Sequence, residues 1–249
     1  MIQDLHSHTY YSFCGTDRPE DVVEAAIAGG IELFGICDHN YGMGFGRTDV
    51  FFNQSDKLKD GYERALRRYF DHINLIKEKY ADRIQILRGI EISTNEKWFR
   101  SRLPESEDVS FFDYCLVEHL GNEDSMLGGD IVSFAKRCAC PTGVAHTDIF
   151  SFCEREGIDP LDYFKRMADA GVFWEMNVNF DSIHNYRKHG YVDKFFSDEE
   201  QQEIIRRSGV RLSIGFDGHR CGEYRADIVK DYCGKIEALG IPMAFDEKN

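Results

Sequence analysis

Residues 4–9, DLHSHT, follow the first short apolar run of the chain and decide how the rest of it is interpreted. Alternate residues of a β-strand point to the same side, so Asp4, His6 and His8 share one face. Two imidazoles on one face can hold one metal ion, and Asp4 is placed to orient one of the rings. The stretch therefore predicts a metal site where the first strand ends.

Further candidate ligands recur at the ends of later predicted strands. Six of the nine histidines fall at or just beyond such an end, together with one glutamate and one aspartate. A single histidine there is usually a hydrogen-bonded structural residue, so the weight lies on the recurrence. The candidate ligands are His6, His8, His39, Glu91, His119, His146, Asp217 and His219. Imidazole mixed with carboxylate suits zinc, manganese, iron or nickel rather than calcium.

Short apolar strands alternate with amphipathic helices along the whole chain. The strands are apolar almost continuously, which is typical of strands covered on both faces. We predict strands over residues 2–6, 32–37, 84–89, 114–118, 143–146, 172–177 and 210–216. We predict helices over residues 18–29, 57–80, 130–140, 160–170, 198–208 and 226–239. Such units in series imply a parallel sheet with right-handed crossovers.

The spread of candidate ligands separates a closed barrel from an open, doubly wound sheet. An open sheet gathers its site at one switch point, whereas a barrel collects residues from the C-terminal ends of nearly all strands. Six of the seven predicted strands contribute a ligand here. We therefore predict an α/β barrel, folded as a single domain over residues 1–249, which is a length typical of such barrels.

Composition limits the partners of the protein. A formal net charge of −14 disfavours binding to long nucleic acids, although bound divalent ions would still admit a small phosphorylated metabolite. No run of 18 apolar residues predicts a membrane span, and no signal peptide fits the N-terminus. The eight cysteines are interpreted as thiols in a reducing cytoplasm, since two of them lie in apolar strands. We expect a cytoplasmic protein, and the sequence indicates no particular oligomeric state.

The motifs resemble those of the polymerase and histidinol phosphatase (PHP) superfamily. They follow the family's order between residues 4 and 220: DLHSHT, Cys37-Asp38-His39, Gly89-x-Glu91, His119, His146 and Asp217-x-His219-Arg220. The resemblance implies a distorted, seven-stranded, TIM-like (β/α)7 barrel that holds up to three metal ions. Position by position, it implies a first ion on His6, His8, Glu91 and Asp217, a second on Glu91, His119 and His146, and a third on His39 and His219.

One position departs from the family pattern. Where histidinol phosphatase-like members usually place another histidine after the first motif, alignment on Gly15 and Thr16 puts Cys14. The thiol either ligates the third ion as a thiolate, which shifts the preference toward zinc or iron, or is a buried thiol beside a weak or empty site.

These observations predict a metal-dependent phosphatase that cleaves a small phosphate monoester, with histidinol phosphate as one candidate. Two or three divalent ions (zinc, iron or manganese) would lower the pKa of water from ~15.7 toward ~7, and hydroxide between the first two would attack phosphorus. Glu91 and Asp217 would be essential to catalysis. Arg220 either grips phosphate or pairs with a neighbouring carboxylate. Asp148 would orient His146 or protonate the leaving group.

Two predicted loops, residues 40–56 and 179–196, would shape the substrate pocket. They offer Arg47, His184 and Arg187 as substrate contacts, among aromatic residues that suit a ring-bearing ester or simply pack on the barrel rim. Glu175 and Asn177 alternate on the sixth predicted strand and are expected at the pocket floor.

Three other functions compete with a small-molecule phosphatase. A nucleotide phosphatase or short-oligonucleotide exonuclease would use the same scaffold. A C–N or C–O hydrolase of the amidohydrolase type usually has a bridging lysine, which no predicted strand end of this chain offers. The barrel could also bind metal without being an enzyme.

Overall fold

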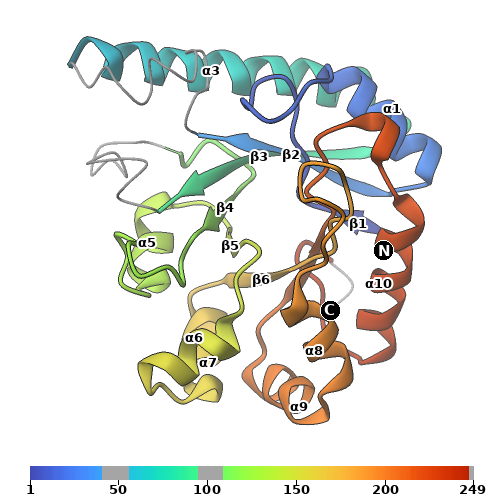
Figure 1. Ribbon diagram of the computed structural model, residues 1–249. Helices are drawn as coiled ribbons and strands as arrows, with labels where there is room; N and C mark the ends of the chain where they lie inside the picture. Colours follow the sequence, from blue (N-terminus) through green and yellow to red (C-terminus); the bar gives the residue numbers. More distant parts are fainter. Residues whose placement is uncertain (41–55, 95–108, 247–249) are drawn as a thin grey trace.

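The computed structural model describes residues 1–40, 56–94 and 109–246 (Figure 1). Within these ranges, seven strands form one sheet in sequence order: β1 (Gln3–Asp4), β2 (Leu33–His39), β3 (Gln85–Ser93), β4 (Tyr114–Glu118), β5 (Thr142–Val144), β6 (Val172–Asn177) and β7 (Leu212–Gly215). Each strand pairs in parallel with the next. This order is the one that successive right-handed βα units produce.

The first and last strands meet, which nearly closes the sheet into a barrel. The backbone N–H of Leu5 donates to the carbonyl of Ile214 at 2.8 Å, and Ser7 pairs in parallel with Gly218. The closure is irregular because β1 is only two residues long. The fold is thus a distorted TIM-like α/β barrel, which confirms the fold class predicted from the sequence.

Helices lie outside the strands (Figure 1). They are α1 (Pro19–Gly29), α3 (Asp56–Lys79), α5 (Ile131–Cys138), α6 (Ile149–Glu156), α7 (Pro160–Asp169), α8 (Gly190–Ser197), α9 (Glu199–Ser208), η1 (Cys221–Glu223) and α10 (Ala226–Ala238). Several begin at a capping carboxylate. The side chain of Asp159 accepts a hydrogen bond from the N–H of Asp162, and Pro160 takes the first helical position of α7.

Two of these helices, α6 and α8, lie where the sequence analysis predicted only connections. Each has eight residues, which is too short for a clear helical period in the sequence. Because α8 takes up the end of the predicted pocket loop, the irregular part of that loop is shorter than expected. Strands β2 and β3 also run further than predicted, since their charged last residues interrupt the apolar run without ending the strand.

The apolar core has two layers. The larger packs the helices against the outside of the sheet, and the smaller fills the inside of the barrel. Within the inner layer the Tyr114 hydroxyl donates to the carbonyl of Leu5 at 2.6 Å. A Cβ at Gly35 or Gly89 would collide with the Tyr114 ring, so glycine at these two positions makes room for it. Further along the strands, polar side chains replace apolar ones inside the barrel.

No helix in the described part of the chain is long and apolar enough to cross a membrane. All eight cysteines lie in that part, and no disulfide joins any two of them. Both observations agree with the expectations drawn from the sequence.

Candidate metal centre

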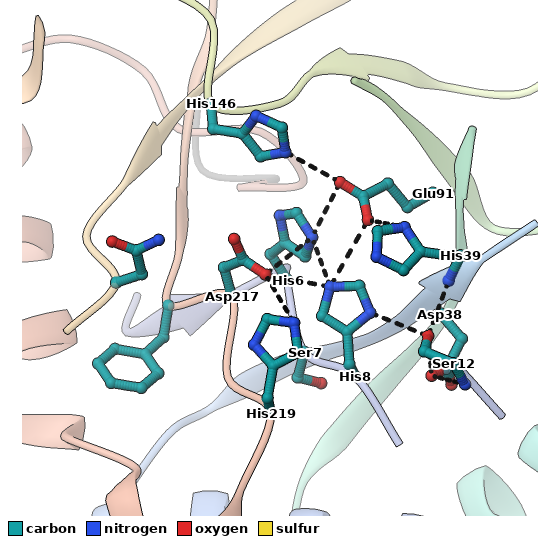
Figure 2. Close-up of polar contacts among 12 residues, drawn as sticks. His6, Ser7, His8, Ser12, Asp38, His39, Glu91, His146, Asp217 and His219 are labelled. Carbon is teal, nitrogen blue, oxygen red and sulfur yellow. Dashed lines mark hydrogen bonds and ion pairs between the residues drawn. The ribbon is translucent and has the colours of Figure 1, made fainter. Parts of the chain in front are cut away.

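The C-terminal ends of the strands bring the candidate ligands together inside the mouth of the barrel. His6 and His8 follow β1, Glu91 lies near the end of β3, His146 follows β5 and Asp217 follows β7. Figure 2 shows their polar atoms turned toward one another. Most of these side chains are buried, although the chain separates them by up to 211 residues (217 − 6).

Four candidate ligands, His6, His8, Glu91 and Asp217, lie close together, and we call this group the cage. The Nε2 atom of His6 lies 3.1 Å from Nε2 of His8 and 3.3 Å from Oε1 of Glu91. The Oδ1 atom of Asp217 lies 3.5 Å from His6 Nε2 and 3.0 Å from His8 Nε2. Donors bound at about 2.1 Å to one tetrahedral ion lie roughly 3.4 Å apart. The distances among His6, His8 and Asp217 therefore suit one divalent ion, and Glu91 contacts both imidazoles, one through each oxygen. These four residues are the set implied for the first ion.

Each imidazole of the cage is oriented through its Nδ1 atom, that of His6 by a carboxylate and that of His8 by a hydroxyl group that bonds a carboxylate. Oε1 of Glu175 lies 2.7 Å from Nδ1 of His6. On the other ring, Nδ1 of His8 lies 3.1 Å from the hydroxyl of Ser12, which itself donates to Asp38 at 2.6 Å. These contacts leave Nε2 of both rings facing the cage, as the ligands of a metal require.

Asp4, which the sequence analysis assigned to orient a ring, has a different role. Its carboxylate accepts the backbone N–H of His6 at 3.2 Å, the N–H of Phe216 at 2.9 Å and the hydroxyl of Tyr224 at 2.8 Å. The prediction was wrong because the short β1 turns the carboxylate toward the backbone of β7. Glu175, predicted only to reach the pocket floor, takes the orienting role instead.

The donors assigned to a second ion are less tightly gathered. Nε2 of His146 lies 3.2 Å from Oε1 of Glu91, while Nδ1 of His119 lies 3.0 Å from the hydroxyl of Ser93. Between the two imidazoles stands Glu118, a carboxylate that the sequence analysis did not single out. It belongs with His39 and Glu91 to a group of donors within 4.8 Å of one another.

The donors assigned to a third ion belong to two separate groups, Cys14 and His39 beside His8, and His219 with Asp181 and His184. Cys14 and His39 offer ligand atoms within 4.8 Å of His8. Nδ1 of His219 lies 3.2 Å from Asp181, which leaves its Nε2 directed at the cage, 3.8 Å from Asp217 Oδ1. Burial raises the pKa of the Cys14 thiol, so a thiolate there would need a cation beside it.

His184, predicted as a substrate contact, lies against the centre. Its Nδ1 is 2.7 Å from Asp181 Oδ1 and its Nε2 is 3.3 Å from Asp217 Oδ2. Asp181 thus orients two imidazoles at once, those of His184 and His219. Asp181 could not be predicted because it lies in an irregular connection, where no period indicates which way a side chain points.

The other predicted substrate and catalytic residues lie further out. The guanidinium of Arg220 is 45% exposed and donates to Ser182 Oγ at 3.0 Å. Arg187 is exposed on the same connection, and Arg47 lies outside the described residues. Asp148 caps α6 by accepting the N–H and hydroxyl of Ser151.

Three candidate ligands have a left-handed backbone, which non-glycine residues rarely adopt. Their φ angles are 65° for His119, 25° for His146 and 55° for Asp217. Such conformations cost on the order of 1–3 kcal/mol each and persist where the surrounding structure enforces them, most often at functional sites. At these three strand ends the strain directs a potential ligand into the barrel mouth.

Imidazoles and carboxylates lie side by side in the centre, and each shifts the pKa of its neighbours. Burial raises the pKa of Glu91, but the imidazoles of His6 and His39 outweigh it and hold that pKa well below its usual range. Burial also raises the pKa of Asp217, but its neighbours, chiefly His6, outweigh this effect and hold that pKa well below its usual range. Burial lowers the pKa of His146, but Glu91 outweighs it and raises that pKa to about 9. The carboxylates therefore stay ionised and available to a cation.

The residues present fit a group of divalent cations. One buried carboxylate oxygen, Glu118 Oε1, accepts no hydrogen bond from any described residue, while Glu91 Oε2 lies 2.7 Å from Nδ1 of His39. A buried anionic oxygen without a donor is costly, and a cation would satisfy it. Imidazole and carboxylate donors together suit zinc, iron or manganese.

Replacing Glu175 with glutamine should weaken metal binding by about 10–100-fold, because the amide holds His6 Nδ1 less firmly and makes that ring a poorer ligand. Competition of the metal-free protein with a chromophoric chelator measures the affinity. Glu154→Gln, which removes an exposed carboxylate from α6, is the matched control and should bind as wild type does. Equal affinities in the two variants would rule out the orienting role.

Comparison with known proteins agrees with this arrangement. A model of the PHP domain matches residues 4–219. A histidinol-phosphatase of Lactococcus lactis subsp. lactis (strain IL1403) is 26% identical over 114 residues, which is 46% of this chain and 37% of that protein. The sequence match thus spans well under two thirds of this relative.

One solved structure shares the fold, and a second is reported beside it. The crystal structure of a histidinol phosphate phosphatase from Lactococcus lactis, complexed with zinc, L-histidinol and phosphate, matches with a TM-score of 0.57 at 16% identity, covering 97% of this chain and 95% of that one. A putative histidinol phosphatase from Listeria monocytogenes has a TM-score of 0.47 at 16% identity, covering 89% of this chain and 96% of that one. With the family model matching nearly the whole described barrel, the chain belongs to the PHP domain family of metal-dependent phosphoesterases.

Proposed function

We propose that the protein is a metal-dependent phosphatase that hydrolyses a small phosphate monoester, histidinol phosphate or a similar ester, at this centre. The observation that carries the proposal is the cage of His6, His8, Glu91 and Asp217, in which Nε2 of each imidazole lies 3.0–3.5 Å from a carboxylate oxygen of Glu91 and of Asp217. Glu91 also faces a second group of donors, so two or three ions would share one carboxylate. Zinc, iron and manganese are the cations that fit.

The chemistry divides between the ions and the side chains. When bound, divalent ions here would lower the pKa of a water molecule and neutralise charge on the phosphoryl oxygens. The chain's own part is to fix that geometry. Glu175 and Asp38 hold the imidazoles of the cage, and burial of the whole cluster excludes bulk water from the donors.

His184 and Arg220 are the substrate contacts that we propose for the phosphate group. Burial lowers the pKa of His184, but Asp181 and Asp217 outweigh it and raise that pKa to about 10. The ring is half-buried beside Asp217, where a phosphoryl oxygen bound at the cage would meet it. Arg220 stands further out on Ser182 and could receive a phosphate at the entrance.

Three further residues complete the proposed site. Arg187 would approach a substrate from the exposed side of the same connection, and Arg47 from residues 41–55. Asp148 could protonate the leaving group only by giving up its bonds to Ser151. A location in the reducing cytoplasm fits the eight cysteines, none of which forms a disulfide.

The competing hydrolases differ from the phosphatase in the substrate they would accept. A formal net charge of −14 disfavours long nucleic acids but not mononucleotides. For an amidohydrolase, the place of the usual bridging lysine is held by Glu91, which lies 3.3 Å from His6 and 3.2 Å from His146. The substrate panel below includes both classes.

The test is a turnover assay on protein of known metal content. We expect a chromogenic phosphomonoester to be hydrolysed, and chelator to stop the reaction. Within a panel of histidinol phosphate, other phosphorylated metabolites, mononucleotides, a phosphodiester, an amide and a lactone, the monoesters should have the highest kcat/KM. Turnover that survives chelation, or faster cleavage of the amide or lactone, would contradict the proposal.

A further inference from the structure

Glu118, the last residue of β4, is a buried carboxylate that the motifs of the chain do not account for. Only 4% of the residue is exposed. Along β4 it alternates with Leu116 and Tyr114, which fill the inside of the barrel, so its side chain points to the same interior as theirs. At this height the interior holds the candidate ligands.

The carboxylate of Glu118 lies among the donors assigned to the second ion. Its Oε2 is 3.5 Å from Nδ1 of His119 and 3.8 Å from Nε2 of His146. Its Oε1 is 3.7 Å from Nδ1 of His39. Donors around one ion lie roughly 3.0–3.4 Å apart, so only a small contraction would place these atoms around a shared cation.

One oxygen of this carboxylate, Oε1, is buried and accepts no hydrogen bond from any described residue. The carboxylates of Glu91 and Glu118 offer oxygens within 4.8 Å of each other. Two buried carboxylates side by side need either a proton or a cation between them.

We propose that Glu118 is a metal ligand which, together with Glu91 and His146, holds a second divalent cation next to the cage. The inference rests on the metal centre of the proposed function and adds a ligand that the resemblance does not assign. A site with two carboxylates is richer in oxygen than one built on Glu91 and two imidazoles. It should therefore favour Mn²⁺ or Fe²⁺ more than an imidazole-rich site does.

The alternative is that Glu118 carries a proton and merely donates a hydrogen bond. Glutamine separates the two roles, because an amide keeps the size and the donor of a protonated carboxyl group but is a far poorer ligand for a cation. Glu118→Asp keeps the charge and shortens the reach. Glu123→Gln removes an exposed carboxylate five residues further along the chain and is the matched control.

The experiment is a calorimetric titration of metal-free protein with Mn²⁺, with bound metal counted by mass spectrometry after desalting. Wild type and Glu123→Gln should bind at least two ions. Glu118→Gln should keep the first ion and lose the second, or bind it about 100-fold more weakly, with Glu118→Asp in between. Circular dichroism checks that each variant is folded, and the aspartate variant serves alone if the glutamine variant is not.

The outcomes separate the inference from the proposed function. If Glu118→Gln binds as many ions as wild type with the same affinities, Glu118 is not a ligand, and the metal centre stands without it. The same holds if Glu118→Asp is the folded variant and matches wild type. If wild type itself binds no Mn²⁺, Zn²⁺ or Fe²⁺, the centre and the proposed function both fail.

Discussion

Replacing Asp217 with alanine should lower kcat/KM for a phosphate monoester by about 10³-fold or more while the chain remains folded. Asp217 lies 3.0 Å from His8 Nε2 and 3.5 Å from His6 Nε2, so its loss opens one side of the cage. A thousandfold loss corresponds to about 4 kcal/mol of transition-state stabilisation, which is in proportion to the loss of one anionic ligand to the reacting ion. Glu91→Ala should act at least as strongly, since Glu91 faces both groups of donors.

Steady-state kinetics on a chromogenic monoester measure both variants, with circular dichroism as the check on folding. Asp169→Ala removes an exposed carboxylate at the end of α7 and should leave the rate unchanged. A folded Asp217→Ala or Glu91→Ala protein that turns over as wild type does would overturn the assigned site.

Removing the metal should abolish activity and lower the thermal midpoint of unfolding by about 5–10 °C. An ion present at about 100 times its Kd contributes roughly 2.7 kcal/mol of stability, and each kcal/mol shifts Tm by about 2–4 °C in a protein of this length. The carboxylates that the ions would neutralise are buried, so the metal-free state loses this stabilisation directly. Differential scanning fluorimetry with chelator, then with added Zn²⁺ or Mn²⁺, measures the shift and its reversal.

The metal-free protein should also depend on pH in a definite direction. The pKa of His146 is raised to about 9, above its usual value of 6.5, because Glu91 outweighs the cost of burial. A raised pKa contributes stability that is complete below pH 6.5 and is lost as pH rises through about 9. Tm of the metal-free chain should therefore fall over that window.

A Tm indifferent to chelator and to added ions would show that the cluster is an internal ion-pair network and not a metal site.

The barrel could be predicted from the sequence because its evidence is local. Each strand is a short apolar run, and each candidate ligand follows its run at a strand end, where a barrel gathers its functional residues. The ends of β2 and β3 were placed too early for the same reason. His39 and Glu91 are charged or polar residues inside the strand, and only the centre around them makes their burial tolerable.

The partners of the ligands could not be predicted in the same way. Asp38 acts on His8 through Ser12, and Asp181 acts on His219 from an irregular connection, so neither contact follows from a strand or helix period. Glu118 is different, since its alternation with Leu116 and Tyr114 on β4 predicts that its side chain lies inside the barrel. It was not predicted as a ligand because the role was assigned to His119, the histidine that follows it.

The most direct test of the metal site is a crystal structure, from crystals grown with Mn²⁺ or Zn²⁺ and with diffraction measured at the absorption edge of the metal. An anomalous peak should lie between His6, His8, Glu91 and Asp217, about 2.0–2.3 Å from each ligand atom, with a second peak on the far side of Glu91. Peaks confined to the surface, with the four side chains turned away from one another, would contradict the account.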